Sequence, residues 1–141
     1  MKLRKAFTLM ELMIVIMILG LLTAIVVPNL VGQSERAKRS LVCIQMKTIS
    51  ESLKMFRADF GNYPQLDEGL EALINNPDAS KYKNYPNGGY LSAQSAPKDS
   101  WGTEYVYIAD GEIFDIISLG RDKKEGGDGD DEDIYFSKCQ N

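Results

Sequence analysis

The chain opens with a long apolar segment that a single charge interrupts. Residues 7–27 contain no charged side chain except that of Glu11. At about 1.5 Å of rise per residue, a helix of this length spans roughly 30 Å, the hydrocarbon thickness of a bilayer. A carboxylate inside such a segment costs roughly 2.5–3.5 kcal/mol on insertion. Glu11 therefore predicts a positively charged partner within the membrane, such as the free α-amino group that cleavage after Ala6 would create at Phe7.

The apolar segment has a basic flank on its N-terminal side, made by Lys2, Arg4 and Lys5. Because basic residues stay on the cytoplasmic side, we expect a single-pass inner-membrane orientation with the C-terminal body in the bacterial periplasm. The apolar run is longer than the core of an ordinary signal peptide, and no small-residue cleavage site follows it. The segment is therefore expected to stay attached and to contact membrane lipid.

A second apolar pattern follows Pro28 and a polar stretch. Six apolar residues recur at alternating spacings of four and three: Val42, Met46, Ile49, Leu53, Phe56 and Phe60. This spacing indicates one face of a helix that packs on a core. Gly61-Asn62-Tyr63-Pro64 then ends the helix. The pattern predicts one long helix from about residue 7 to residue 60, kinked near Pro28, where the proline ring disrupts helical packing.

The rest of the chain alternates turn signals with short apolar runs. The predicted elements are a short helix, a loop without regular structure and three strands: residues 68–74, 78–98, 104–108, 112–118 and 134–136. Ala109-Asp110-Gly111 separates the first two strands, and an Asp-Gly pair between apolar runs is a hairpin signal. The sequence thus predicts an α+β fold, with a long N-terminal helix packed against a small antiparallel sheet.

Charge and composition exclude several function classes. Apart from Lys2, Arg4, Lys5 and Glu11, the chain has 13 basic and 19 acidic residues, a net charge of −6. Such a surface repels phosphate backbones, so direct nucleic-acid binding is not expected. The chain has no histidine, which removes the commonest general base and the commonest zinc ligand. No pattern suggests two carboxylates across a cleft, so we expect a protein that is not an enzyme.

The two cysteines, Cys43 and Cys139, are compatible with one disulfide in an oxidising compartment. That bond would close a loop of nearly the whole body, worth roughly 4–5 kcal/mol in the chain-entropy model. Two unpaired cysteines are the alternative, because the sequence does not give the distance between their Cα atoms.

An acidic loop lies between Gly120 and Ile134. It holds seven carboxylates: Asp122, Glu125, Asp128, Asp130, Asp131, Glu132 and Asp133. Three nearby glycines let the backbone fold tightly, and hard oxygen ligands in a flexible loop suit Ca²⁺. The spacing is not that of an EF-hand. From composition alone, a solvated acidic loop is the stronger interpretation.

The head of the chain carries a recognisable motif. Ala6-Phe7-Thr8-Leu9-Met10-Glu11-Leu12, followed by the apolar run and Pro28, resembles the class III signal of type IV pilins and pseudopilins. The resemblance implies a leader, residues 1–6, that a prepilin peptidase removes between Ala6 and Phe7, with N-methylation of Phe7. It also implies a polymerisation helix over residues 7–28, in which Glu11 pairs with the amino group of Phe7 in a neighbouring subunit. Ala6 stands where the family usually has glycine.

The body, residues 29–141, contains motifs that point to one family among the pilins and pseudopilins. Its segments that carry the likeness are Gly61-Asn62-Tyr63-Pro64, Glu68-Gly69-Leu70-Glu71-Ala72-Leu73, Asp99-Ser100-Trp101-Gly102-Thr103-Glu104-Tyr105 and Asp115-Ile116-Ile117-Ser118-Leu119-Gly120-Arg121-Asp122. They resemble the major pseudopilins of type II secretion, the G subunit, although Ser100 replaces a usual proline. The resemblance implies a type IV pilin-like fold and a homopolymeric pseudopilus, built with minor pseudopilins on an inner-membrane assembly platform, that supports export of folded proteins across the outer membrane.

The same resemblance gives the acidic loop a function, because these pseudopilins carry a structural Ca²⁺ there. The implied ligands are the side chains of Asp122, Asp131 and Asp133 with the main-chain carbonyl of Leu119. The third side chain is open among Asp130, Asp131 and Glu132. The family usually lacks the cysteine pair, so the resemblance does not decide the disulfide.

Two other functions are compatible with the sequence. One is a pilin-like subunit of a type IV or DNA-uptake pilus, since such pilins more often end in a disulfide-bounded loop and Cys139 fits that pattern. The other is a monomeric, signal-anchored Ca²⁺-binding module of the periplasm, which would be neither processed at Ala6 nor self-associating.

Overall fold

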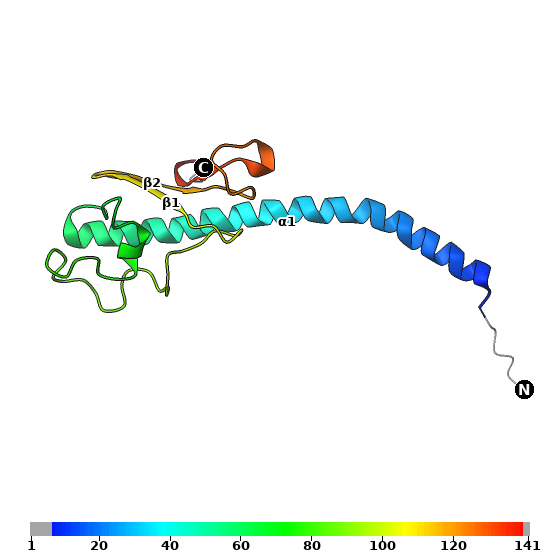
Figure 1. The fold of residues 1–141 in the computed structure, drawn as a ribbon, viewed down its shortest axis with the longest axis horizontal. Helices are drawn as coiled ribbons and strands as arrows, with labels where there is room; N and C mark the ends of the chain where they lie inside the picture. The colour runs from blue at the N-terminus through cyan, green and yellow to red at the C-terminus, as the bar shows by residue number, and fades with distance from the viewer. Residues whose placement is uncertain (1–6, 140–141) are drawn as a thin grey trace, which may run out of the picture. The chain divides into compact units, whose positions relative to one another are not determined.

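The computed structural model describes residues 7–139, except for the side chains of residues 25–31. The elements in chain order are α1 (Leu9–Phe60), η1 (Leu70–Leu73), β1 (Val106–Asp110), β2 (Ile113–Ser118), η2 (Gly129–Asp131), β3 (Ile134–Tyr135) and η3 (Phe136–Lys138), where η marks a 3₁₀ helix (Figure 1). The chain divides into two compact units, Met1–Arg36 and Ala37–Asn141. The predicted α+β class, with one long helix and a small antiparallel sheet, is confirmed.

The N-terminal unit consists of the first part of α1. The helix begins at Leu9, two residues later than expected, because Thr8 serves as its N-cap. The Thr8 hydroxyl accepts a hydrogen bond from the backbone N–H of Glu11 at 3.2 Å, which satisfies one free donor of the first turn. Within the described residues, no helix has both the length and the apolar character that a membrane crossing requires. Helical backbone continues through Pro28, whose side chain lies outside the description, so the predicted kink stays a prediction.

The second unit is built on the apolar face of α1. Five of the six predicted positions, Val42 to Phe56, are buried, and Phe60 is half-buried against the same cluster. Strands β1 and β2 run alongside this half of the helix (Figure 1). From the sheet, Ile116 and Ile134 enter the core. The apolar stripe therefore does what its spacing predicts, which is to give the sheet a surface on which to pack.

The sheet has the order β1-β2-β3, with antiparallel pairing throughout. The predicted hairpin is present, but its first strand is shifted from the predicted 104–108 to Val106–Asp110 and its turn is shorter. Ala109 and Asp110 belong to β1 and pair with Phe114 and Ile113, which leaves only residues 111–112 in the turn. Gly111 adopts a φ of 58°, the left-handed conformation that a two-residue hairpin turn needs.

The predicted helix over residues 68–74 is shorter and of the 3₁₀ type, since η1 covers only Leu70–Leu73. The backbone of Gly69, with φ 57° and ψ −160°, cannot continue a helix. Just before it, the Glu68 carboxylate accepts a hydrogen bond from the Gln65 N–H at 2.8 Å and closes a turn. Residues 78–98 have no regular structure, as predicted, and their tyrosines Tyr82 and Tyr90 pack against Phe56.

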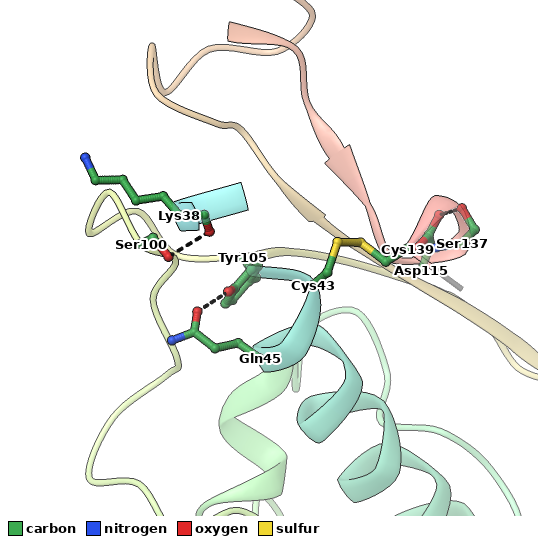
Figure 2. Close-up of a disulfide and its surroundings, with 8 residues drawn as sticks. All are labelled: Lys38, Cys43, Gln45, Ser100, Tyr105, Asp115, Ser137 and Cys139. Atoms are coloured by element: carbon green, nitrogen blue, oxygen red, sulfur yellow. Dashed lines mark hydrogen bonds between the residues drawn. A yellow bond between two sulfur atoms is a disulfide. The ribbon is translucent and has the colours of Figure 1, made fainter. Parts of the chain in front are cut away.

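A tight turn around Asp99 joins this loop to the sheet. The Asp99 carboxylate accepts hydrogen bonds from the N–H groups of Trp101 and Thr103, at 3.0 and 2.8 Å, and from the Ser118 hydroxyl at 2.6 Å. Two neighbours of this turn reach α1, because Ser100 donates to the Lys38 carbonyl and Tyr105 donates to Gln45 (Figure 2). The turn therefore fixes the start of β1 against both β2 and the helix.

Candidate functional site

Glu11 lies on the first turn of α1, and Phe7 lies just before the helix begins. Phe7 is 86% exposed, and Glu11 is exposed as well, while Ala6 lies outside the described residues. Glu11 is three residues after the cap, so Thr8 and Glu11 have the spacing of a capping box. A carboxylate in the first turn also faces the positive end of the helix dipole. Thr8 was not among the predicted site residues, although a threonine three residues before a glutamate is the sequence signal of such a cap.

In the acidic loop, Asp133 has the environment of a ligand. Its side chain is buried, and its Oδ2 accepts a hydrogen bond from the Gly126 N–H at 2.8 Å. Its own N–H donates to the Gly126 carbonyl at 3.2 Å, so the two residues close a ring. The other carboxylate oxygen, Oδ1, is buried without a hydrogen-bond partner. A buried, unpaired carboxylate oxygen is costly, and a bound cation would remove that cost.

The other predicted ligands lie elsewhere on the loop. The Asp131 carboxylate accepts a hydrogen bond from the Arg121 Nε at 2.8 Å, and Asp122 accepts one from the Lys124 N–H at 3.1 Å. Leu119 is half-buried at the end of β2. Among residues 7–139, no three acidic, cysteine or histidine side chains come close enough together to hold a metal ion. Asp133 is thus the one predicted ligand with an unpaired buried oxygen among the described residues, whereas Asp131 is engaged by an arginine.

Glycines bring the main chain of the loop close together. A Cβ on Gly127 would overlap the Asp131 carbonyl, and a Cβ on Gly120 would lie 3.3 Å from the Glu132 carbonyl oxygen. Both glycines have a positive φ, at 83° and 68°. The loop therefore packs its backbone at these two positions more closely than a side chain would allow.

Arg39 connects the loop to α1. Its guanidinium donates to the carbonyl oxygens of Glu132 and Asp130, at 2.9 and 3.4 Å. These partners are more than 90 positions away in the chain, and no local pattern marks them. Only the fold reveals this contact.

The two cysteines, whose pairing the sequence left open, are bonded to each other. Cys43 lies on α1 one turn after Arg39, and Cys139 follows η3; their Cα atoms are 5.6 Å apart (Figure 2). The bond joins the C-terminal end of the described chain to the helix on which the core is built.

Comparison with known proteins decides the family. The chain matches the family "Type II secretion system (T2SS), protein G" over residues 29–137, and the "Prokaryotic N-terminal methylation motif" over residues 1–27. The chain belongs to the protein G family of type II secretion systems.

Relatives in the protein G family match almost from end to end. The type II secretion system core protein G of Vibrio cholerae serotype O1 is 41% identical over 137 residues, covering 94% of this chain and 92% of the relative. The core protein G of Pseudomonas aeruginosa is also 41% identical, covering 93% of each chain. The crystal structure of the major pseudopilin from the type 2 secretion system of enterohaemorrhagic Escherichia coli is similar, with a TM-score of 0.62 and 32% identity over 79% of this chain and 96% of that one.

These matches confirm the resemblance that the sequence motifs carried. The methylation motif covers the head around Phe7 and Glu11, and the protein G match covers the four body segments. The long helix with its three-stranded sheet agrees with the solved pseudopilin.

Proposed function

We propose that this protein is the subunit that polymerises into the pseudopilus of a type II secretion system and supports export of folded proteins across the outer membrane. The observation that carries the proposal is the near full-length likeness to core protein G, joined to an N-terminal methylation motif on the same chain. Its partners are further copies of itself, minor pseudopilins and the inner-membrane assembly platform. The role is structural rather than enzymatic.

In this proposal, residues 7–28 anchor the subunit in the inner membrane, with the N-terminus cytoplasmic and the body periplasmic. The exposed apolar side chains along the start of α1 fit contact with lipid and with neighbouring helices: Leu9, Met10, Leu12, Met13, Ile14, Val15, Ile16, Met17, Ile18, Leu19, Leu21 and Leu22. The disulfide fits an oxidising compartment for the body.

Processing tests the proposal most directly. A prepilin peptidase is expected to cut between Ala6 and Phe7 and to methylate the new amino group, which Glu11 of a neighbouring subunit then pairs with. Intact mass and N-terminal sequencing of protein from bacterial membranes should show a chain that begins at Phe7 and is heavier by one methyl group. A chain that still begins at Met1 would contradict the proposal and would favour a monomeric signal-anchored module.

Filament formation and secretion assays distinguish a secretion pseudopilus from an uptake pilus. Overexpressed with the secretion machinery, the protein should form filaments visible by electron microscopy, and its deletion should abolish release of folded exoproteins. Loss of DNA uptake with normal secretion would instead identify a subunit of an uptake pilus, the alternative that the C-terminal cysteine kept open.

The acidic loop is proposed to hold a structural Ca²⁺. Asp133 Oδ1 is the supporting observation, because it is buried and unpaired. The Leu119 carbonyl, Asp122 and Asp131 would complete the ligand set, with Asp131 exchanging its bond to Arg121 for the ion. Bound there, Ca²⁺ would neutralise carboxylates that otherwise repel one another.

A further inference from the structure

The C-terminal segment, residues 134–139, is joined to β2 by a short strand pairing and a few side-chain contacts. Strand β3 contributes two residues, which pair with Ser118 and Ile117 of β2. Beyond it, the Asp115 carboxylate accepts hydrogen bonds from the Ser137 N–H at 3.2 Å and hydroxyl at 2.8 Å. Phe136 is buried and stacks on Phe114 with ring centroids 5.9 Å apart. A segment with so few bonds is of the kind that opens locally at low cost.

The disulfide attaches this segment to α1. Cys43 and Cys139 are 96 positions apart, and all three strands lie between them in sequence. Two cysteines bond only when their Cα atoms come within about 7 Å. In the folded chain the bond holds the C-terminal segment against the helix on which the sheet is packed.

The bond is accessible and lies among charged side chains of both signs. Both cysteines are only partly buried, and a surface hollow borders the bond on each side. The charged residues that line one hollow are Lys47, Glu51 and Lys54, and those that line the other are Arg39, Glu132, Asp133 and Lys138. Arg39 and Lys47 are one helical turn before and after Cys43. The thiolate is the form of cysteine that attacks a disulfide.

We propose that Cys43 and Cys139 are a substrate site for a thiol–disulfide oxidoreductase, and that their oxidation fixes residues 134–139 on α1. The Cys43 thiolate attacks the disulfide of the oxidant, which gives a mixed disulfide and releases one thiolate of the oxidant. The Cys139 thiolate then attacks the Cys43 sulfur, which forms the Cys43–Cys139 bond and releases the second thiolate. Two electrons and two protons pass from the cysteines to the oxidant, which becomes a dithiol.

Thiol trapping tests the partner. The full-length chain is made in bacteria with and without their extracytoplasmic dithiol oxidase, quenched in acid and labelled with a maleimide-linked polymer. We expect no label on protein from the oxidase-containing strain and two labels per chain without the oxidase. Complete oxidation in both strains, or free thiols in both, would overturn the proposal.

Hydrogen exchange tests the structural consequence. The full chain in detergent is compared with the variants C43S, C139S and C43S/C139S. Amides of residues 134–139 should exchange at least about tenfold faster in all three variants alike, while those of residues 42–56 stay unchanged. If the variants do not fold, the wild-type chain reduced after folding replaces them. Equal exchange in the oxidised and reduced forms would overturn the proposal. Neither readout requires a filament, so the result is independent of the proposed function.

Discussion

The carboxylate of Glu11 has one electrostatic role within its own chain and a second, proposed role between chains. Within one chain, the residue lies in the first turn of α1 behind the Thr8 cap, where the helix dipole favours a negative charge. Between chains, we propose that it pairs with the amino group of Phe7 in a neighbouring subunit. The first effect stabilises the start of the helix, and the second would bring subunits into register. Substitutions at Thr8 and Glu11 distinguish the effect on the helix start from the effect on subunit pairing.

E11A is expected to abolish filament formation while leaving membrane insertion and cleavage after Ala6 intact, because the charge that would pair between subunits is lost. T8V is the matched control: it removes the cap, at a cost of about 1 kcal/mol, and keeps the carboxylate. Electron microscopy of sheared cells, with intact mass of the membrane-bound subunit, checks both. Normal filaments from E11A, or equal loss in both variants, would contradict the pairing.

Glu68 is a second carboxylate whose surroundings determine its state. Burial opposes its ionisation, but hydrogen bonds from Lys81, the Gln65 N–H and Tyr82 outweigh burial and hold the pKa of Glu68 below its ordinary value of 4.5. A lowered folded-state pKa contributes stability that is present above the unfolded pKa and is lost as the pH falls through the folded one.

E68Q is therefore expected to lower the free energy of unfolding at pH 7 by about 1–2 kcal/mol, since the side chain is only 11% exposed and its charged hydrogen bonds are lost. Below pH 4.5 the difference from wild type should shrink. Thermal unfolding of the full chain in detergent across pH 3–7 measures this difference. A gap that stays constant with pH would show that the ionised form is not what matters.

At the scale of elements, the hydrophobic periodicity predicted the buried face of the helix correctly, whereas the turn signals did not predict the exact ends of the short elements. The spacing of Val42 to Phe60 is a property of the helix alone, so the buried face of α1 could be predicted. The ends of the hairpin and the nature of η1 depend on backbone angles at Gly111 and Gly69, which only the packed chain sets. Arg39 and its carbonyl partners, far apart in sequence, had no local signal at all.

Element η1 also depends on a glycine in the irregular loop. Tyr90 and Leu91 both donate their N–H groups to the Leu73 carbonyl, at 2.7 and 2.9 Å. Gly89 brings the loop to this point with a φ of 73°, and a Cβ there would lie 2.5 Å from the Ile74 carbonyl oxygen. The end of η1 and the loop are therefore in direct backbone contact.

G89A is expected to destabilise the protein by about 2–3 kcal/mol, because it adds a backbone clash to the strain of a positive φ. G88A is the control, since its φ is 95° and its added Cβ would have open space. Chemical denaturation of both variants in detergent gives the comparison. Equal destabilisation would mean that strain alone, and not the contact with η1, determines the cost.

At the scale of the whole molecule, one stretch of α1 receives links from three parts of the chain. The links to residues 38–45 come from the Asp99 turn, the acidic loop and the C-terminal segment: Ser100 to Lys38, Glu132 to Arg39, Cys139 to Cys43 and Tyr105 to Gln45. The sequence marked the cysteines and the acidic loop as notable, but it could not show that they converge on adjacent turns of the helix.

If the acidic loop binds Ca²⁺ as proposed, an excess of chelator should lower the melting temperature of the full chain by several degrees, because ligand binding adds stability by mass action. D133N should already melt lower and should not respond to chelator, whereas the exposed loop variant E125Q should respond like wild type. Thermal melts in detergent with and without Ca²⁺ provide the test. A wild-type chain that ignores the chelator would contradict the metal site.

The disulfide between Cys43 and Cys139 also determines how the subunit responds to mechanical tension. Tension that enters along α1 and leaves at the C-terminal end crosses from one sulfur to the other, so the hydrogen bonds of the sheet carry none of it. The 96 positions between the cysteines therefore cannot be stretched out by such a force. Fully extended, they would span roughly 320–350 Å at about 3.3–3.6 Å per residue. The oxidised body is therefore expected to extend very little under tension, whereas the reduced body can extend as its sheet unfolds.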